Sequence, residues 1–162
     1  MNHHVSSHTF ALRPMREDDT PALADLHKRA ILAAYFPHYA PEAVRDWANS
    51  RSPARYLNAQ ARGERFLVYE RDGQPVGFVS WHADELCAMY VDPAYQKQHI
   101  GEILTRAAMA QALHDGQPLT WVKAALPARG FYEKMGFTFK TFGTSTVQGH
   151  TLEDVLLEYP LP

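Results

Sequence analysis

LCAMYVDPAYQKQHIGEIL, residues 86–104, is the stretch of sequence that decides the fold. Its apolar first part predicts a strand ending at Val91, a short polar turn follows, and Ile100, Ile103 and Leu104 begin an amphipathic helix. The first backbone N–H groups of a helix have no partners inside it, and the helix dipole adds partial positive charge there. Phosphates bind at such a place without lysine or arginine. The segment therefore predicts a phosphate site between a strand and a helix.

The sequence before this segment predicts a strand, three helical stretches and a hairpin. The expected elements are a strand at residues 9–13, a first helix capped by Asp18, Asp19 or Thr20, helices at 42–49 and 54–61, and strands at 65–70 and 75–81. Pro37 breaks the first helix, and Pro41 and Pro53 suit the first turns of the next two. Asp72-Gly73 turns the chain between the two strands. A third strand, starting at residues 84–85 and ending at Val91, completes a meander.

The sequence after this segment predicts a helix, a strand, a last helix and a closing hairpin. The expected elements are a helix from residue 100 to near Gly116, a strand at 119–125, a helix between Pro127 and Gly136, and a hairpin that turns at Gln148-Gly149. The whole pattern predicts an α+β (mixed α/β) fold with one mostly antiparallel sheet flanked by helices. We expect a disordered polar leader over residues 1–8 and a single domain over residues 9–162.

Composition excludes several classes of function. With 46% hydrophobic and 21% charged residues, a formal net charge of −2 and no long apolar run, the chain predicts neither a nucleic-acid partner nor a membrane span. Cys87 is the only cysteine, and the first residues do not form a secretory signal, so we expect a cytoplasmic protein. The nine histidines are scattered without the close pairing of zinc ligands, so we expect no metal site.

Two motifs carry a resemblance to a known family. Gln96-Lys97-Gln98-His99-Ile100-Gly101 resembles Q/R-x-x-G-x-G/A, the acyl-CoA pyrophosphate motif of the GNAT N-acetyltransferase superfamily. Phe131-Tyr132-Glu133-Lys134-Met135-Gly136-Phe137 is similar to the FYEKxGF segment that follows the fifth strand in many members. The predicted elements agree with that superfamily over most of the chain, whereas motif-level similarity is confined to residues 86–137.

The resemblance implies a binding mode for acetyl-CoA as cosubstrate. The two central strands of a GNAT fold part and leave a V-shaped slot, in which pantetheine lies like an added strand. The backbone of residues 89–91 would bond the pantetheine amides, the backbone from Gln98 to Glu102 would hold the pyrophosphate, and Gln96 would fix the turn. The residues implied in cofactor binding are Met89, Tyr90, Val91, Gln96, Lys97, Gln98, His99, Ile100, Gly101 and Glu102.

The same resemblance points to catalytic residues. Acetyl transfer from a thioester to an amine needs a neutral amine, stabilisation of the developing oxyanion and a proton for the departing thiolate. Glu85 lies where several GNAT enzymes carry the general base, and Asp84 and His82 are alternatives. Tyr132 lies where the family tyrosine donates a proton to the thiolate, although packing against the sheet would also explain it. A strand N–H near Tyr90 would meet the oxyanion.

Three features depart from the family pattern or suggest another reaction. His99 replaces the first motif glycine, which costs little if its φ is negative and of order 1 kcal/mol or more if its φ is positive. Residues 125–127 lack the asparagine that contacts the cofactor in many members. Cys87 could in principle take the acetyl group covalently, but a lone cysteine in an apolar strand is usually a buried hydrophobe.

These observations predict an N-acetyltransferase that transfers acetyl from acetyl-CoA to a primary amine by direct attack in a ternary complex. The alternatives are a non-catalytic acyl-CoA-binding sensor or subunit with the same fold, and a structural partner that binds no cofactor. The acceptor is a small-molecule amine or a polypeptide N-terminus, and the fold allows a homodimer. The aromatic residues expected to wall the acceptor pocket are Tyr35, Phe36, Tyr39 and Trp47.

Overall fold

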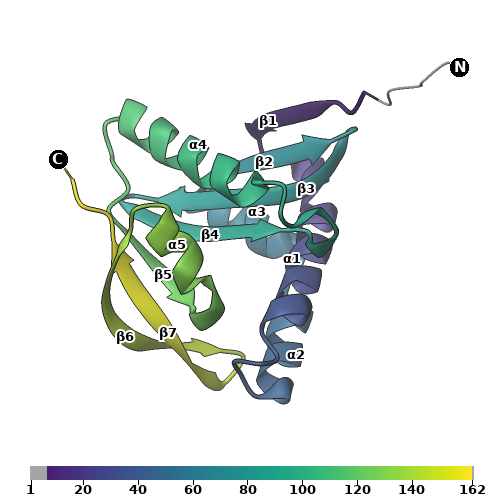
Figure 1. Cartoon of the computed structure of the whole chain (residues 1–162). Coiled ribbons are helices and arrows are strands. Elements are labelled where there is room, and N and C mark those ends of the chain that lie inside the picture. The colour runs from purple at the N-terminus through teal and green to yellow at the C-terminus, as the bar shows by residue number, and fades with distance from the viewer. Residues whose placement is uncertain (1–6, 162) are drawn as a thin grey trace, which may run out of the picture.

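The computed structural model of the chain describes residues 7–161 and is built on one sheet with strand order β1-β2-β3-β4-β5-β7-β6 (Figure 1). The strands are β1 Phe10–Pro14, β2 Arg65–Arg71, β3 Gln74–His82, β4 Glu85–Val91, β5 Trp121–Ala125, β6 Thr138–Val147 and β7 His150–Glu158. The helices are α1 Thr20–Ala34, α2 Pro41–Asn49, α3 Pro53–Ala61, α4 Ile100–His114 and α5 Arg129–Lys134. Short 3-10 turns cover Glu17–Asp19, Pro93–Tyr95 and Leu126–Ala128.

This arrangement confirms the predicted α+β fold with a mostly antiparallel sheet. Pro41 and Pro53 begin α2 and α3, as expected from their fixed φ and missing N–H. The prediction that Pro127 opens the last helix was wrong by two residues. Pro127 lies inside a 3-10 turn, and α5 begins at Arg129.

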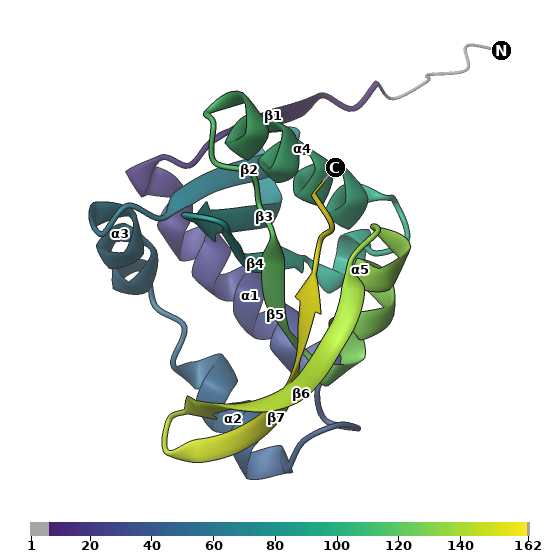
Figure 2. The same cartoon turned by 90° about the vertical axis from the view of Figure 1, so that its left-hand side faces the viewer.

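The central strands β4 and β5 run parallel and soon part. They pair only at Glu85 with Trp121 and at Leu86 with Val122, and β5 then pairs on its other side with β7. Figure 2 shows the two strands diverging from that end of the sheet. The edge of β4 that follows Leu86 is therefore left without a strand partner, which agrees with the V-shaped slot implied by the resemblance.

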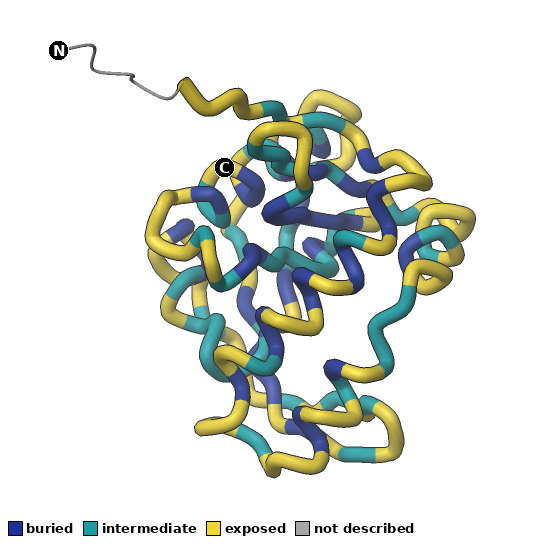
Figure 3. Tube along the Cα trace, turned by 90° about the vertical axis from the view of Figure 1, so that its right-hand side faces the viewer, coloured by how far each residue is buried: buried dark blue, intermediate teal, exposed yellow. Residues whose placement is uncertain are grey.

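Helices cover the two faces of the sheet with separate cores. Val79 and Leu86 point to the α4 side, where they pack with Leu104 of that helix. Phe78 and Val68 point to the other side, where they pack in one cluster with α1 and α3. Figure 3 shows the buried positions concentrated on the central strands and on one side of each helix. The alternation of neighbouring β3 residues between the two faces follows the two-residue period of a strand.

The structure bears on the predicted polar leader, on membrane-spanning helices and on metal sites. Residues 1–6 of the predicted polar leader lie outside the described residues, while Thr9 N donates to Asp72 Oδ1 at 2.9 Å. Among residues 7–161, no helix has the length and apolar character needed to cross a membrane. Over the same residues, the structure contains no group of three or more His, Cys, Asp or Glu side chains placed to hold a metal ion.

Candidate functional site

The slot between β4 and β5 opens into a cavity of about 650 Å³. Its walls come from α1, β4, the turn before α4, the first turn of α4, and the segment leading into α5. The predicted residues that line it are Met89, Tyr90, Val91, Gln96, Lys97, His99, Ile100, Gly101, Glu102 and Tyr132. The structure therefore brings together all predicted cofactor-binding residues except Gln98, whereas the predicted base Glu85 lies outside this cavity.

The turn between β4 and α4 is held by a hydrogen bond to the end of β4 and by an ion pair with α1. Gln96 Nε2 donates to Val91 O at 3.2 Å, so this side chain ties the turn back to the end of β4. Asp92, which is buried, accepts from Ala94 N at 3.0 Å and pairs with Arg29 Nη2 of α1 at 2.5 Å. The predicted role of Gln96 in fixing the turn agrees with this geometry, and the Arg29 contact was not foreseen.

The backbone of this turn adopts the left-handed conformation twice. Lys97 has φ +63° and His99 has φ +61°, so the costly alternative for His99 is the one found. The first backbone hydrogen bond of the helix runs from Ile103 N to His99 O at 3.0 Å. The N–H groups of the residues just before Ile103 therefore have no carbonyl partner within α4. Such alternation of conformations makes a concave set of N–H groups that suits an anion.

Gly101 leaves room where the slot meets α4. A Cβ added at Gly101 would lie 3.1 Å from Met89 Cε and 3.4 Å from Phe131 Cε2, and both neighbours line the slot. A side chain at this position would thus fill the space at the helix start. The free N–H groups and this open space together fit a diphosphate with an attached chain running along β4.

Tyr132 belongs to the FYEKxGF-like segment after β5 and lies in the wall of the slot. Its side chain is 4% exposed, and its ring packs edge-on against Phe131 and Phe137 at centroid distances of 5.1 and 5.6 Å. Within residues 7–161 its hydroxyl makes no hydrogen bond to another protein group, and burial raises the pKa of the phenol. The ring is therefore a core residue while the neutral hydroxyl is available to a ligand in the slot.

The three carboxyl and imidazole candidates for the base differ in their surroundings. Burial, followed by the charges of Glu64 and Asp84, raises the pKa of Glu85. Asp84 accepts from Thr120 Oγ1 at 2.9 Å and from Trp121 Nε1 at 3.0 Å, and these bonds lower its pKa. His82 is exposed and lines neither the slot nor a second cavity, which Cys87 lines. Glu85 is thus the candidate whose environment most favours proton acceptance, although it does not line the slot.

Of the aromatic residues predicted to wall the acceptor pocket, Tyr35 lines the slot, whereas Tyr39 and Trp47 do not. Tyr35 lines the slot and donates from its hydroxyl to Tyr90 at 3.2 Å. Tyr39 instead accepts from Leu126 N at 2.9 Å and donates to Glu153 O at 2.7 Å. The segment that lacks the family asparagine is therefore anchored by a tyrosine from the loop after α1. Trp47 packs against Tyr35 and Tyr39 and does not line the slot.

Glu64 was missed by sequence reasoning, and Cys87 lies beside it. Burial and then the Glu64 carboxylate raise the pKa of the Cys87 thiol, which disfavours the thiolate needed for covalent transfer. Cys87 is also the extra residue of a β-bulge, because Ser80 pairs with Ala88 while Trp81 pairs with Leu86. Nothing in the local sequence around Glu64 indicated that it approaches β4.

Comparison with known proteins agrees with this geometry. Residues 62–139 match the family model of the acetyltransferase (GNAT) domain. The curated relative YafP of Escherichia coli K12, an uncharacterized N-acetyltransferase, is 25% identical over 126 residues, which cover 78% of this chain and 79% of YafP. A GCN5-related N-acetyltransferase from Rhodopseudomonas palustris has a solved structure similar to this one, with a TM-score of 0.85 and 29% identity over 99% of this chain and 100% of that chain.

A structural neighbour has been solved with its ligand. The PaiA N-acetyltransferase from Thermoplasma acidophilum, solved in complex with coenzyme A, has a TM-score of 0.75 and 21% identity over 94% of this chain and 99% of that chain. At that identity the similarity concerns the fold. Together with the motif turn and the parted central strands, these findings show that the chain contains an acetyltransferase (GNAT) domain, which the family model matches over residues 62–139.

Proposed function

We propose that this protein transfers an acetyl group from acetyl-CoA to a primary amine by direct attack in a ternary complex. The observation that carries the proposal is the separation of β4 from β5 after two residue pairs, with the motif turn at one end of the opening and Tyr132 in its wall. Free strand edges accept extended ligands by backbone hydrogen bonds. Pantetheine, with its two amides, is such a ligand.

The binding residues have separate tasks in this proposal. The backbone from Gln98 to Glu102 binds the pyrophosphate through free N–H groups, and Gln96 keeps that turn against Val91. The backbone of residues 89–91 bonds the pantetheine amides. The positive φ values at Lys97 and His99 are consistent with backbone donors converging on one anion.

The chemistry needs a proton removed at the amine and a proton delivered at sulfur. Glu85 accepts the amine proton through water, since its carboxylate lies outside the slot and its pKa is raised toward neutrality. The amine nitrogen then attacks the thioester carbonyl carbon, and a β4 N–H near Tyr90 stabilises the oxyanion. As the C–S bond breaks, the Tyr132 hydroxyl protonates the departing thiolate. The products are the N-acetylated amine and free coenzyme A.

A paired glycine substitution tests whether the slot is the cofactor site. Gly101→Ala fills the space beside Met89, while Gly130→Ala on α5 places a methyl group where no atom lies within 4 Å. We expect Gly101→Ala to weaken coenzyme A binding on the order of tenfold, equivalent to about 1.4 kcal/mol, in calorimetry. Gly130→Ala is expected to bind as the wild type does. Equal affinities in all three proteins would refute this site.

Thiol release tests turnover itself. With acetyl-CoA and pooled primary amines, we expect free thiol to form faster than in the absence of an amine. Coenzyme A binding with no amine-dependent thiol release would instead support the non-catalytic acyl-CoA-binding alternative. Absence of both binding and thiol release would remove the proposed function altogether.

A further inference from the structure

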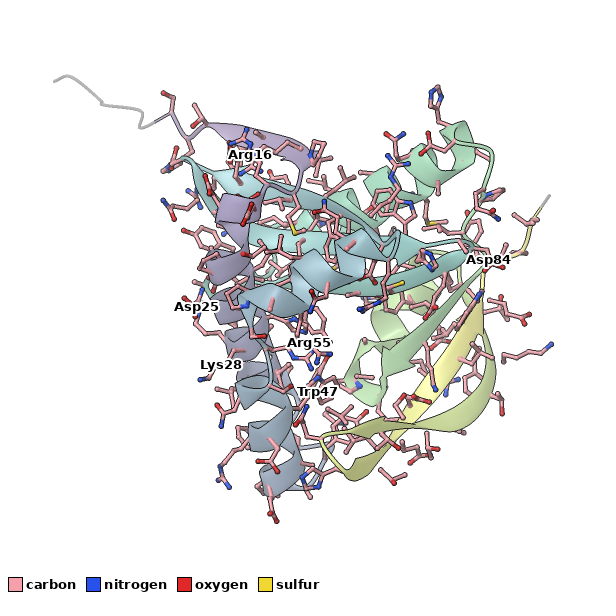
Figure 4. All side chains as sticks on the ribbon, turned by 180° about the vertical axis from the view of Figure 1, so that it is seen from behind. Arg16, Asp25, Lys28, Trp47, Arg55 and Asp84 are labelled. Atoms are coloured by element: carbon pink, nitrogen blue, oxygen red, sulfur yellow. The ribbon has the colours of Figure 1, made fainter. Side chains whose placement is uncertain are left out.

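A second cavity, of about 480 Å³, lies on the α1 and α3 face of the sheet and reaches β4. Cys87 and Ala88 of β4 form one wall, and α3 with the segment before it forms another. Arg51, Arg55 and Arg62 all line this cavity. Figure 4 shows Arg55 on the side of α3 that faces Trp47 of α2. The cavity is a separate space from the cofactor slot and shares the strand β4 with it.

The three arginines of this cavity have no carboxylate partner among residues 7–161. The Arg51 guanidinium bonds only Ser50 Oγ, at 2.8 and 3.2 Å. The arginines that do form ion pairs in the structure are Arg13, Arg29, Arg65, Arg106 and Arg129. Partial burial and the nearby charge of Arg55 lower the pKa of Arg51. Like charges gathered in a half-enclosed space are unfavourable without a counter-charge, and guanidinium groups pair best with carboxylate or phosphate.

One ring nitrogen of a buried histidine in the wall of the same cavity has no partner within residues 7–161. His27 is 4% exposed, and its Nδ1 lies 2.9 Å from the Tyr56 hydroxyl. Its Nε2 is buried with no hydrogen bond among the described residues. Burial and then the charges of Arg51 and Arg55 lower the pKa of His27, so the ring is neutral. A buried polar atom of this kind is normally satisfied by a hydrogen bond.

The cavity lies beside the point where the acceptor must meet the thioester. The His27 ring lies against the Tyr90 ring at a centroid distance of 3.8 Å and an interplanar angle of 36°, and Tyr90 lines the slot. Ala88, in the cavity wall, and Tyr90 are two residues apart on β4, which is roughly 7 Å along a strand. Glu64 supplies a carboxylate to the same cavity, and its charge is one of the causes that raise the pKa of Glu85. One ligand could thus place an anionic group at the arginines and an amine toward β4.

Building on the proposed function, we infer that the acceptor is a small primary amine that carries a carboxylate or phosphate group. Arg51, Arg55 and Arg62 bind the anionic group, and the amine points toward β4. The cavity volume suits a molecule of amino-acid size, and the unpaired arginines repel polyamines and other cationic acceptors. This assigns the substrate class that the fold alone leaves open.

A panel of matched amines tests the inference with the wild-type protein. γ-Aminobutyrate is compared with butylamine, and O-phosphoethanolamine with ethanolamine, using acetyl-CoA and a thiol-release assay. Putrescine serves as the cationic member. We expect at least one anionic amine to exceed its neutral match in kcat/KM on the order of 10- to 100-fold, with putrescine below both. The two anionic arms distinguish a carboxylate acceptor from a phosphate acceptor.

Substitution of the arginines provides the second measurement. In Arg55→Gln and Arg62→Gln, we expect KM for the preferred anionic amine to rise on the order of tenfold while the Kd of coenzyme A stays at the wild-type value. Arg55→Lys is expected to recover part of the loss because it restores the charge. Arg45→Gln is the matched control, since Arg45 is exposed on α2 and lies over Phe36, outside the cavity.

The outcomes separate this inference from the proposed function. If coenzyme A binds and neutral amines are acetylated as well as anionic ones, the substrate class is wrong and the acetyltransferase function stands. The same conclusion follows if only peptides are acetylated, or if Arg55→Gln and Arg45→Gln have the same effect on KM. If coenzyme A does not bind, the proposed function fails first, and calorimetry shows that directly.

Discussion

Replacement of Tyr132 by phenylalanine separates catalysis from packing at the wall of the slot. The substitution keeps the ring that packs on Phe131 and Phe137 and removes only the hydroxyl, which has no protein partner within residues 7–161. Because no buried partner is left unsatisfied, we expect the free energy of unfolding to change by less than about 1 kcal/mol. For a chain of this length the Tm then shifts by no more than ~4 °C.

The effect on rate is expected to be far larger. Loss of a general acid costs on the order of 10²- to 10⁴-fold. That range corresponds to about 2.7–5.5 kcal/mol in the activation free energy of acetyl transfer. kcat from steady-state thiol release, Kd of coenzyme A from calorimetry and Tm from thermal melting are measured on one preparation. Tyr69→Phe is the control, because Tyr69 of β2 packs near Phe10 and lines neither cavity.

The possible results point in different directions. A Tyr132→Phe enzyme with kcat within about threefold of the wild type would refute proton donation by this hydroxyl, since the general-acid contribution is then missing. A large fall in Tm or in coenzyme A affinity would show that the hydroxyl supports the structure. Only a loss of kcat with both other quantities retained agrees with the proposed role.

Three further substitutions test the strain at His99, the role of Glu85 as base, and the ion pair between Arg13 of β1 and Asp19 of the 3-10 turn before α1. His99→Gly relieves a left-handed conformation that costs about 1–2 kcal/mol, whereas glycine stabilises the unfolded state by roughly 0.4–1 kcal/mol through added conformational freedom. We therefore expect Tm to rise slightly in thermal melts. A lower Tm would contradict the strain. Because burial raises the pKa of Glu85, we expect the acid limb of the pH profile of kcat/KM to have an apparent pKa above that of an ordinary glutamate. Glu85→Gln should abolish that limb. An unchanged pH profile in this variant would exclude Glu85 as the base. Asp19 is buried, which alone would raise its pKa, but bonds from Arg13 and from Arg16 N lower it below 3.8. The stabilising contribution of the Asp19 carboxylate is present above its unfolded-state pKa and is lost as the pH falls through its folded-state pKa. We therefore expect Asp19→Asn to lower the free energy of unfolding by about 2–4 kcal/mol at neutral pH, measured by urea unfolding, and by less at low pH. A cost that does not vary with pH would argue against this linkage.

Local sequence signals predicted the elements wherever the cause was itself local. Pro41 and Pro53 begin helices because a fixed φ and a missing N–H suit the first turn. The end of the last helix at Gly136, which has φ +100°, follows from the same kind of rule. The start of that helix did not, because Leu126 N is bonded by the hydroxyl of Tyr39, which lies far away in sequence.

The cofactor slot was predicted from residues that are close in sequence, whereas the arginine-lined cavity was not. The turn from Gln96 to Gly101 has a pattern of its own, which a reader can recognise without the fold. Arg51, Arg55 and Arg62 are the charged residues of the stretch 51–62, which contains α3, and their spacing is that of an ordinary solvated helix. Only the packing of α3 over the sheet directs them to Ala88 of β4. Their missing carboxylate partners cannot be recognised from sequence.

The brief parallel pairing of β4 with β5 divides the sheet into a four-strand block and a three-strand block. Just two residue pairs form the seam, so we expect amide hydrogen exchange to be fastest along it. A ligand that fills the opening between the strands lies between the two blocks, and its departure would be easier when the blocks move apart. Release of spent coenzyme, rather than the acetyl transfer itself, would then govern turnover in this enzyme.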